Sequence, residues 1–133
     1  MTRRFAEDTK VPVQQSIEEI RSTVTRYGGE QFLYGVTEDR IVIGFTKDGR
    51  QVRFQVKQGE NPQNDRRLAR ALLLVLKAKL EAVASGVSVF ESEFLANIVL
   101  PDGRLVSQHV LPGISHAYEH PDEMPALLPD YSA

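Results

Sequence analysis

The chain has 133 residues, 41% of them hydrophobic, and a formal net charge of −2. It contains no cysteine, which excludes disulfides, thiol catalysis and thiolate metal sites and fits a reducing cytosol. A chain of this length forms one domain of ordinary size, which needs no disulfide or metal to fold.

The charge is divided unevenly along the chain. Residues 1–79 hold 15 Lys/Arg and 10 Asp/Glu, a net of +5, whereas residues 80–133 hold Arg104 alone against 8 acids, a net of −7. This division indicates either an anionic partner for the first half or an acidic tail with its own function. No apolar run approaches the roughly 20 residues that span a bilayer, and the start of the chain does not have the pattern of a secretory signal. We therefore expect a cytoplasmic protein with no membrane partner.

The first element is predicted to be an amphipathic helix. Ser16 and Glu19 have the S-x-x-E spacing of a capping box, and an apolar stripe follows them as far as Tyr27. Gly28-Gly29 ends the helix, because glycine readily adopts the left-handed conformation that helix C-termini favour.

Residues 32–57 alternate between apolar and polar side chains with period two. The pattern predicts three strands near 32–36, 41–46 and 52–56, and Asp48-Gly49 supplies the tight turn of the second hairpin. We therefore predict an antiparallel meander with one apolar and one polar face.

A long helix is predicted next, with Asn64 or Asp65 as its cap and Gly86 at its end. Apolar residues occur on nearly every side of its middle, which predicts a largely buried helix that covers the sheet. Ser88 and Glu91 form a second S-x-x-E box that opens another helix.

The C-terminal part is less regular. After a turn at Pro101-Asp102-Gly103, residues 105–111 form one more short element, either helix or strand. Residues 112–133 hold four prolines and predict an extended acidic tail that could dock through Ala126-Leu127-Leu128. The prediction is an α+β two-layer sandwich over residues 1–111: a helix, a three-stranded antiparallel meander, a long buried helix and a further helix, followed by the tail 112–133.

Several stretches together resemble a family of small uncharacterised proteins carried by bacteriophages and prophages. The resemblance covers about residues 4 to 128 and implies a phage setting and the cytoplasm of a bacterial host. It implies no activity and no functional residue. The stretches that carry it include Arg4-Phe5-Ala6-Glu7, Gly49-Arg50-Gln51-Val52-Arg53-Phe54, the run 76–83, Glu93-Phe94-Leu95-Ala96 and Pro101-Asp102-Gly103.

A basic surface is the first candidate site. Arginine guanidinium groups suit phosphate, and the start of the long helix adds backbone N–H groups, so a nucleic-acid backbone could be contacted there. Acids interspersed at Asp48, Glu60 and Asp65 favour the alternative that these are solvated surface charges. The candidate residues are Arg50, Arg53, Lys57, Arg66, Arg67 and Arg70.

Catalytic and metal sites are not predicted. The chain has no Cys nucleophile, no G-x-S-x-G and no Gly-rich phosphate loop, so we expect no enzyme activity and no cofactor. The string His116-Ala117-Tyr118-Glu119-His120 matches the H-x-x-E-H pattern of zinc proteases. We reject a metal role because Pro112, Gly113 and Pro121 would leave no room for a stable helix.

The acidic tail is the second candidate site. Glu119, Asp122, Glu123, Leu127 and Leu128 could bind a host or phage protein, or the basic half of another copy in a homo-oligomer. Two functions therefore stay open. The favoured one is a phage accessory protein that acts by protein–protein interaction, and the alternative is sequence-independent contact with nucleic-acid phosphates.

Overall fold

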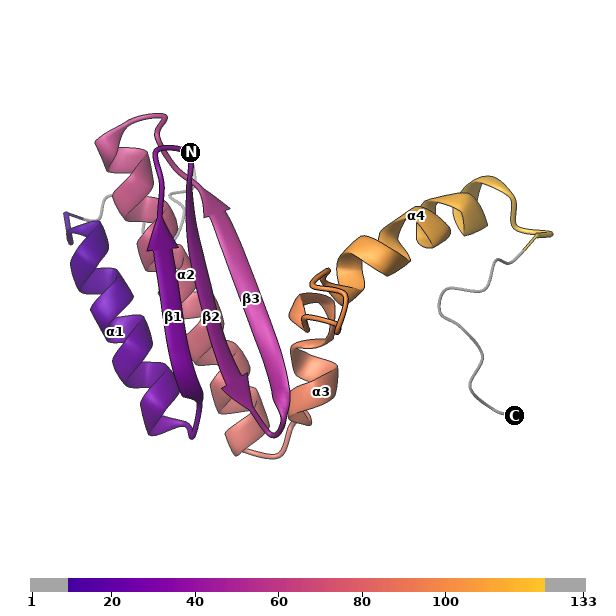
Figure 1. Ribbon diagram of the computed structural model, residues 1–133, viewed down its shortest axis with the longest axis horizontal. Coiled ribbons are helices and arrows are strands. Elements are labelled where there is room, and N and C mark those ends of the chain that lie inside the picture. Colours follow the sequence, from indigo (N-terminus) through magenta and orange to yellow (C-terminus); the bar gives the residue numbers. More distant parts are fainter. Residues whose placement is uncertain (1–9, 124–133) are drawn as a thin grey trace.

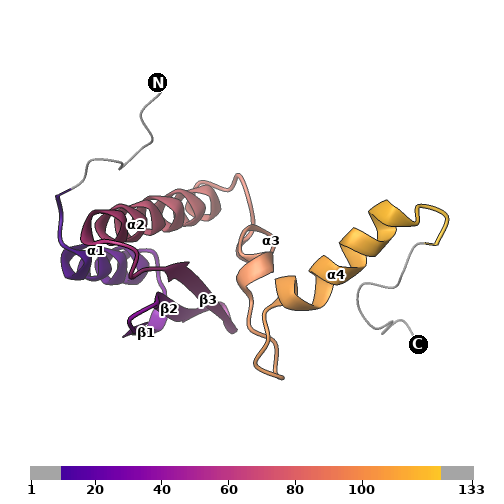
Figure 2. The ribbon, with the colours of Figure 1, turned by 90° about the horizontal axis from the view of Figure 1, so that it is seen from above.

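The computed structural model describes residues 10–123. Helices α1 and α2 pack side by side on one face of a three-stranded antiparallel sheet of order β1-β2-β3 (Figures 1 and 2). This confirms the predicted α+β fold and the meander. The elements are α1 (Val13–Arg26), β1 (Glu30–Val36), β2 (Arg40–Lys47), β3 (Arg50–Lys57), α2 (Pro62–Ala84), α3 (Phe90–Glu93), the 3-10 helix η1 (Leu95–Asn97) and α4 (Val106–Glu119).

The apolar core lies between the sheet and the two helices. Phe94 packs into this core, and its ring lies edge-to-face against Phe45 (5.9 Å between centroids) and Phe54 (6.0 Å). The fully buried aliphatic side chains are Ile17, Ile20, Val24, Ile41, Ile43, Val52, Leu76 and Leu80.

Helix α1 begins about one turn earlier than predicted. Its N-cap is Pro12, and the backbone N–H of Ser16 donates to the carbonyl of Pro12 (3.2 Å). Ser16 is 0% exposed inside the helix, and among the described residues its hydroxyl has no hydrogen-bond partner. The predicted capping box is therefore wrong, because Ser16 lies on the buried face beside Ile17 and Ile20.

Strands β2 and β3 follow the predicted alternation. The second hairpin turns at Asp48 (φ 52°) and Gly49 (φ 75°), and Lys47 pairs with Arg50 across it. Positive φ at both central residues is what a tight hairpin turn needs, which confirms the Asp-Gly signal. β1 is exposed along most of its length and carries a register shift between Glu30 and Leu33.

Helix α2 is amphipathic instead of buried on nearly all sides. Its inner face is covered by α1 and the sheet, whereas Val75 on the outer face is 47% exposed. The cap also differs from the prediction. Asn61 Oδ1 accepts from the N–H of Asn64 (2.8 Å), and Asp65 Oδ1 accepts from the N–H of Gly59 (2.8 Å). The helix therefore starts at Pro62, a residue suited to the first helical position.

The segment after α2 seals part of the sheet edge. α3 has only four residues, and its N-cap Val89 makes no side-chain cap bond, so the second predicted capping box is wrong. After η1 the chain runs along the outer edge of β3, where the N–H of Val99 donates to the carbonyl of Gln51 (2.8 Å). Asn97 Nδ2 also donates to the carbonyl of Arg53 (3.0 Å).

Helix α4 settles the element that the sequence left open. Residues 105–111 enter a helix that continues through Pro112 to Glu119, so the predicted extended tail is wrong over 112–119. α4 starts beside the β3 edge of the sheet and projects away from the two layers (Figures 1 and 2). Leu127 and Leu128 lie outside the described residues.

Candidate interaction site

The structure distributes the predicted basic residues over separate surfaces. Arg53 and Lys57 lie on the sheet, whereas Arg66, Arg67 and Arg70 lie on α2 in the helix layer. Arg50, at the hairpin end, forms an ion pair with Glu91 (3.4 Å). The six residues therefore come from both layers of the fold.

Most of these guanidinium groups already have partners. Arg70 pairs with Glu19 of α1, and Arg67 Nη2 donates to Asn64 Oδ1 (2.8 Å). Arg53 Nη2 donates to the carbonyl of Gly103 (3.1 Å) in the loop before α4. The Arg70 and Arg53 contacts join elements of the fold, which favours the interpretation of these charges as structural and solvated.

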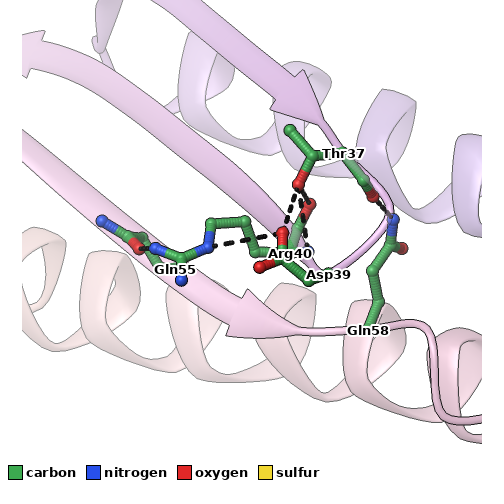
Figure 3. A network of polar contacts seen from close by, with 5 residues as sticks. All are labelled: Thr37, Asp39, Arg40, Gln55 and Gln58. Carbon is green, nitrogen blue, oxygen red and sulfur yellow. Dashed lines mark hydrogen bonds and ion pairs between the residues drawn. The ribbon is translucent and has the colours of Figure 1, made fainter.

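A polar network holds the β1–β2 turn against the end of β3 (Figure 3). Arg40 Nη1 donates to Gln55 Oε1 (2.8 Å), and Gln58 Nε2 donates to the carbonyl of Thr37. The Thr37 hydroxyl donates to Asp39 (2.8 Å), and this bond holds the pKa of the Asp39 carboxyl below its usual value, with Arg40 assisting. No sequence pattern indicated Arg40 as a site residue. In the network its guanidinium group lies beside the carboxylate of Asp39.

The histidine string lies on α4 and just beyond it. The rings of His116 and His120 are 4.6 Å apart, and His116 Nε2 lies 3.8 Å from Glu123 Oε2. The reason given for rejecting a metal role, that no helix would form, is wrong. Within residues 10–123, however, no group of three or more His, Asp or Glu side chains has a metal-binding arrangement.

Exposed apolar side chains follow one face of α4. Val106 is buried at the start of the helix, and Val110 packs against the core one turn later. Beyond this point Leu111, Ile114 and Tyr118 are 58%, 38% and 86% exposed. Their spacings of 3 and 4 put them on one face of the helix, which we call the α4 stripe.

The start of α4 is held by a hydrogen bond to the segment along β3 and by bonds within its own first turn and the preceding loop. The N–H of Val106 donates to the carbonyl of Ile98 (2.9 Å), and Gln108 Oε1 accepts from the N–H of Leu105 (2.7 Å). His109 Nε2 lies 2.8 Å from Asp102 Oδ2. The N–H of Arg104 is the main cause that lowers the pKa of the Asp102 carboxyl, and His109 adds to it. These bonds set the direction in which α4 points.

Arg104 also repairs the helix where proline interrupts it. Pro112 has no N–H to donate to the carbonyl four residues earlier, which belongs to Gln108. Arg104 Nη2 donates to that carbonyl instead (3.1 Å). This substitution explains how the helix passes Pro112, where the sequence analysis expected it to have ended.

The acidic candidates lie at the outer end of the same helix. Glu119 is the last residue of α4, and Asp122 and Glu123 follow it, all three exposed. They therefore share one projecting element with the α4 stripe. A helical-period pattern across 110–118 was present in the sequence, but Pro112 and Gly113 concealed it.

An open groove lies beside the base of α4. Its volume is about 700 Å³, and its apolar lining includes Leu95, Ile98 and Val106. The Arg50–Glu91 ion pair also borders it. The groove therefore adds apolar surface at the base of the projecting helix.

Comparison of the chain with protein-family models, with curated proteins and with solved structures gives no match. Among the helices of residues 10–123, none combines the length and apolar character needed to cross a membrane. The resemblance to phage and prophage proteins, and the cytoplasm of a bacterial host as the location, stay predictions.

Proposed function

We propose that the protein is a non-enzymatic phage accessory protein that acts by protein–protein interaction and presents α4 to its partner. The observation that carries this proposal is the α4 stripe, an apolar helix face that the rest of residues 10–123 leaves uncovered. Surface helices of folded proteins normally bury such a face.

The stability of α4 supports the same conclusion. A helix of 14 residues is marginal in water by itself, and proline and glycine inside it weaken it further. The bonds to the body support only its first turn. A partner that covers the α4 stripe would supply the packing that the outer turns lack.

The charge of α4 favours a protein over a nucleic acid as the partner. Glu119, Asp122 and Glu123 would repel phosphates near the stripe. The alternative, phosphate contact through the basic residues, is supported by less, because Arg50 and Arg70 are engaged in ion pairs.

A photo-crosslinking amino acid tests the proposal when placed at Tyr118 of the full chain in bacterial cells. The control places it at His116, which is also exposed but lies on the opposite side of the helix. We expect crosslinks to protein from position 118 and few from position 116. Equal crosslinking from both positions, or none from either, would contradict the proposal.

A further inference from the structure

We infer that the partner of α4 is α4 of a second copy of this chain, in an antiparallel pair with two-fold symmetry. The inference rests on the proposed function, since it names the partner of the same surface. The anchoring of α4, the spacing of its stripe and the charges at its two ends support this pairing.

The anchoring prevents the body of the same chain from covering the stripe. The bond from the N–H of Val106 to the carbonyl of Ile98 and the bond from Arg53 to the carbonyl of Gly103 hold the start of α4 at the edge of the sheet. From there α4 points away from both layers (Figures 1 and 2). Covering Leu111 and Tyr118 by the body would require these bonds to break.

The spacing of the stripe suits pairing with itself. Leu111 lies three residues before Ile114, and Tyr118 lies four residues after it. A two-fold axis beside Ile114 therefore brings Leu111 of one copy opposite Tyr118 of the other. The same surface then serves both partners, as an isologous interface requires.

The charges at the two ends of α4 select the antiparallel arrangement. Arg104, the one Lys or Arg of residues 80–133, lies at the start of α4 beside the positive end of the helix dipole and offsets the single carboxylate there, Asp102, which pairs with His109. Glu119, Asp122 and Glu123 lie at the other end, together with His116 and His120. An antiparallel pair places each acidic end near Arg104 of the second copy, whereas a parallel pair would bring six carboxylates together.

Sedimentation of the purified full-length chain over a range of concentrations tests the pairing. We expect a reversible dimer that Leu111→Glu weakens at least about tenfold, because the charge would be buried in the contact. His116→Glu is the matched control, since it adds the same group to the opposite side of the helix and should leave the dimer intact. Circular dichroism of both variants checks that the body remains folded.

Two outcomes of this experiment would overturn the inference. A wild-type chain that stays monomeric at all concentrations would do so, as would a dimer that Leu111→Glu does not weaken. Crosslinks from position 118 to a different protein would then leave the proposed function standing, whereas the absence of such crosslinks would remove both.

Engineered disulfides test the direction of the pair, since the natural chain has no cysteine. Leu111→Cys and Tyr118→Cys proteins are oxidised separately and as a mixture. An antiparallel pair predicts a disulfide between 111 and 118 in the mixture, because disulfides need Cα atoms about 4.4–6.8 Å apart. Disulfides that form mainly between identical positions would show a parallel pair and overturn the inference.

Discussion

Single residues follow the sequence rules where the backbone imposes the requirement. Gly28 and Gly86 adopt positive φ just after α1 and α2, as predicted. The two capping-box predictions, at Ser16 and Ser88, are wrong, because S-x-x-E spacing also occurs inside and outside helices. What decides the start of α1 is Pro12, and the spacing holds no information about it.

Ser16→Ala tests this correction by the sign of its effect. We expect the free energy of unfolding to rise by about 0.5–1 kcal/mol, because a buried hydroxyl without a partner is lost and alanine favours helix. Urea unfolding measures the difference. If Ser16 capped the helix, the same substitution would lower stability by about 1 kcal/mol.

Arg104 and Pro112 should be energetically coupled. With Pro112 present, Arg104→Ala leaves the Gln108 carbonyl to water, and we expect hydrogen exchange of α4 to quicken about two- to fivefold, or about 0.5–1 kcal/mol. In a Pro112→Ala background the N–H of the alanine donates to the Gln108 carbonyl. The effect of Arg104→Ala on hydrogen exchange should then nearly vanish. The cycle is measured in the Leu111→Glu background so that association does not contribute. An equal effect in both backgrounds would contradict the assignment.

At the scale of elements, period-two alternation located all three strands, although only β2 and β3 bury one face and β1 is largely exposed. The helices were harder. The apolar middle of α2 predicted burial on nearly every side, but α1 and the sheet cover only part of it. α4 was divided at residue 111, because Pro112 normally ends a helix and the compensating Arg104 bond is a tertiary detail.

The ends of α1 and α2 are joined by a titratable contact. Tyr27 Oη donates to Glu81 Oε2 (2.6 Å), and this bond, with burial, raises the pKa of Tyr27. The contact therefore stabilises the fold below pH about 10, the unfolded value, and is lost as pH rises through the raised folded value.

The Tyr27→Phe protein should thus have a lower free energy of unfolding than the wild type at neutral pH. The two values should approach each other at alkaline pH. Urea unfolding of both proteins from pH 7 to 11 measures the difference, which should be constant up to about pH 9 and then shrink. If the difference in the free energy of unfolding does not change over this range, the Tyr27 hydroxyl makes no pH-dependent contribution to stability, which would contradict the prediction.

At the scale of the whole molecule, the sequence predicted the layers but not the surfaces. The charge division suggested one basic surface, and its arginines lie on both layers, Arg53 on the sheet and Arg66 and Arg70 on α2. Which charged side chains meet depends on contacts between distant segments, such as Arg70 with Glu19. The acidic tail was a better guide, since Glu119, Asp122 and Glu123 do lie on one projecting element.

Deleting residues 112–133 should leave the body folded and remove its association. The buried apolar residues of the described chain all precede residue 107, so we expect cooperative urea unfolding with a loss below about 1 kcal/mol. Sedimentation should show a monomer at every concentration. Loss of cooperative unfolding would mean that α4 belongs to the stable core.

The segment that seals β3 also bears on aggregation. A sheet with an unpaired edge can add a strand from another molecule, and β1 already forms one edge of this sheet. Asn97 and Val99 bond to the opposite edge. If this segment opened, the sheet would have two edges able to pair, and copies could add to one another without end, as in fibrils. The segment that bonds to β3 and orients α4 thus also protects the protein against ordered aggregation.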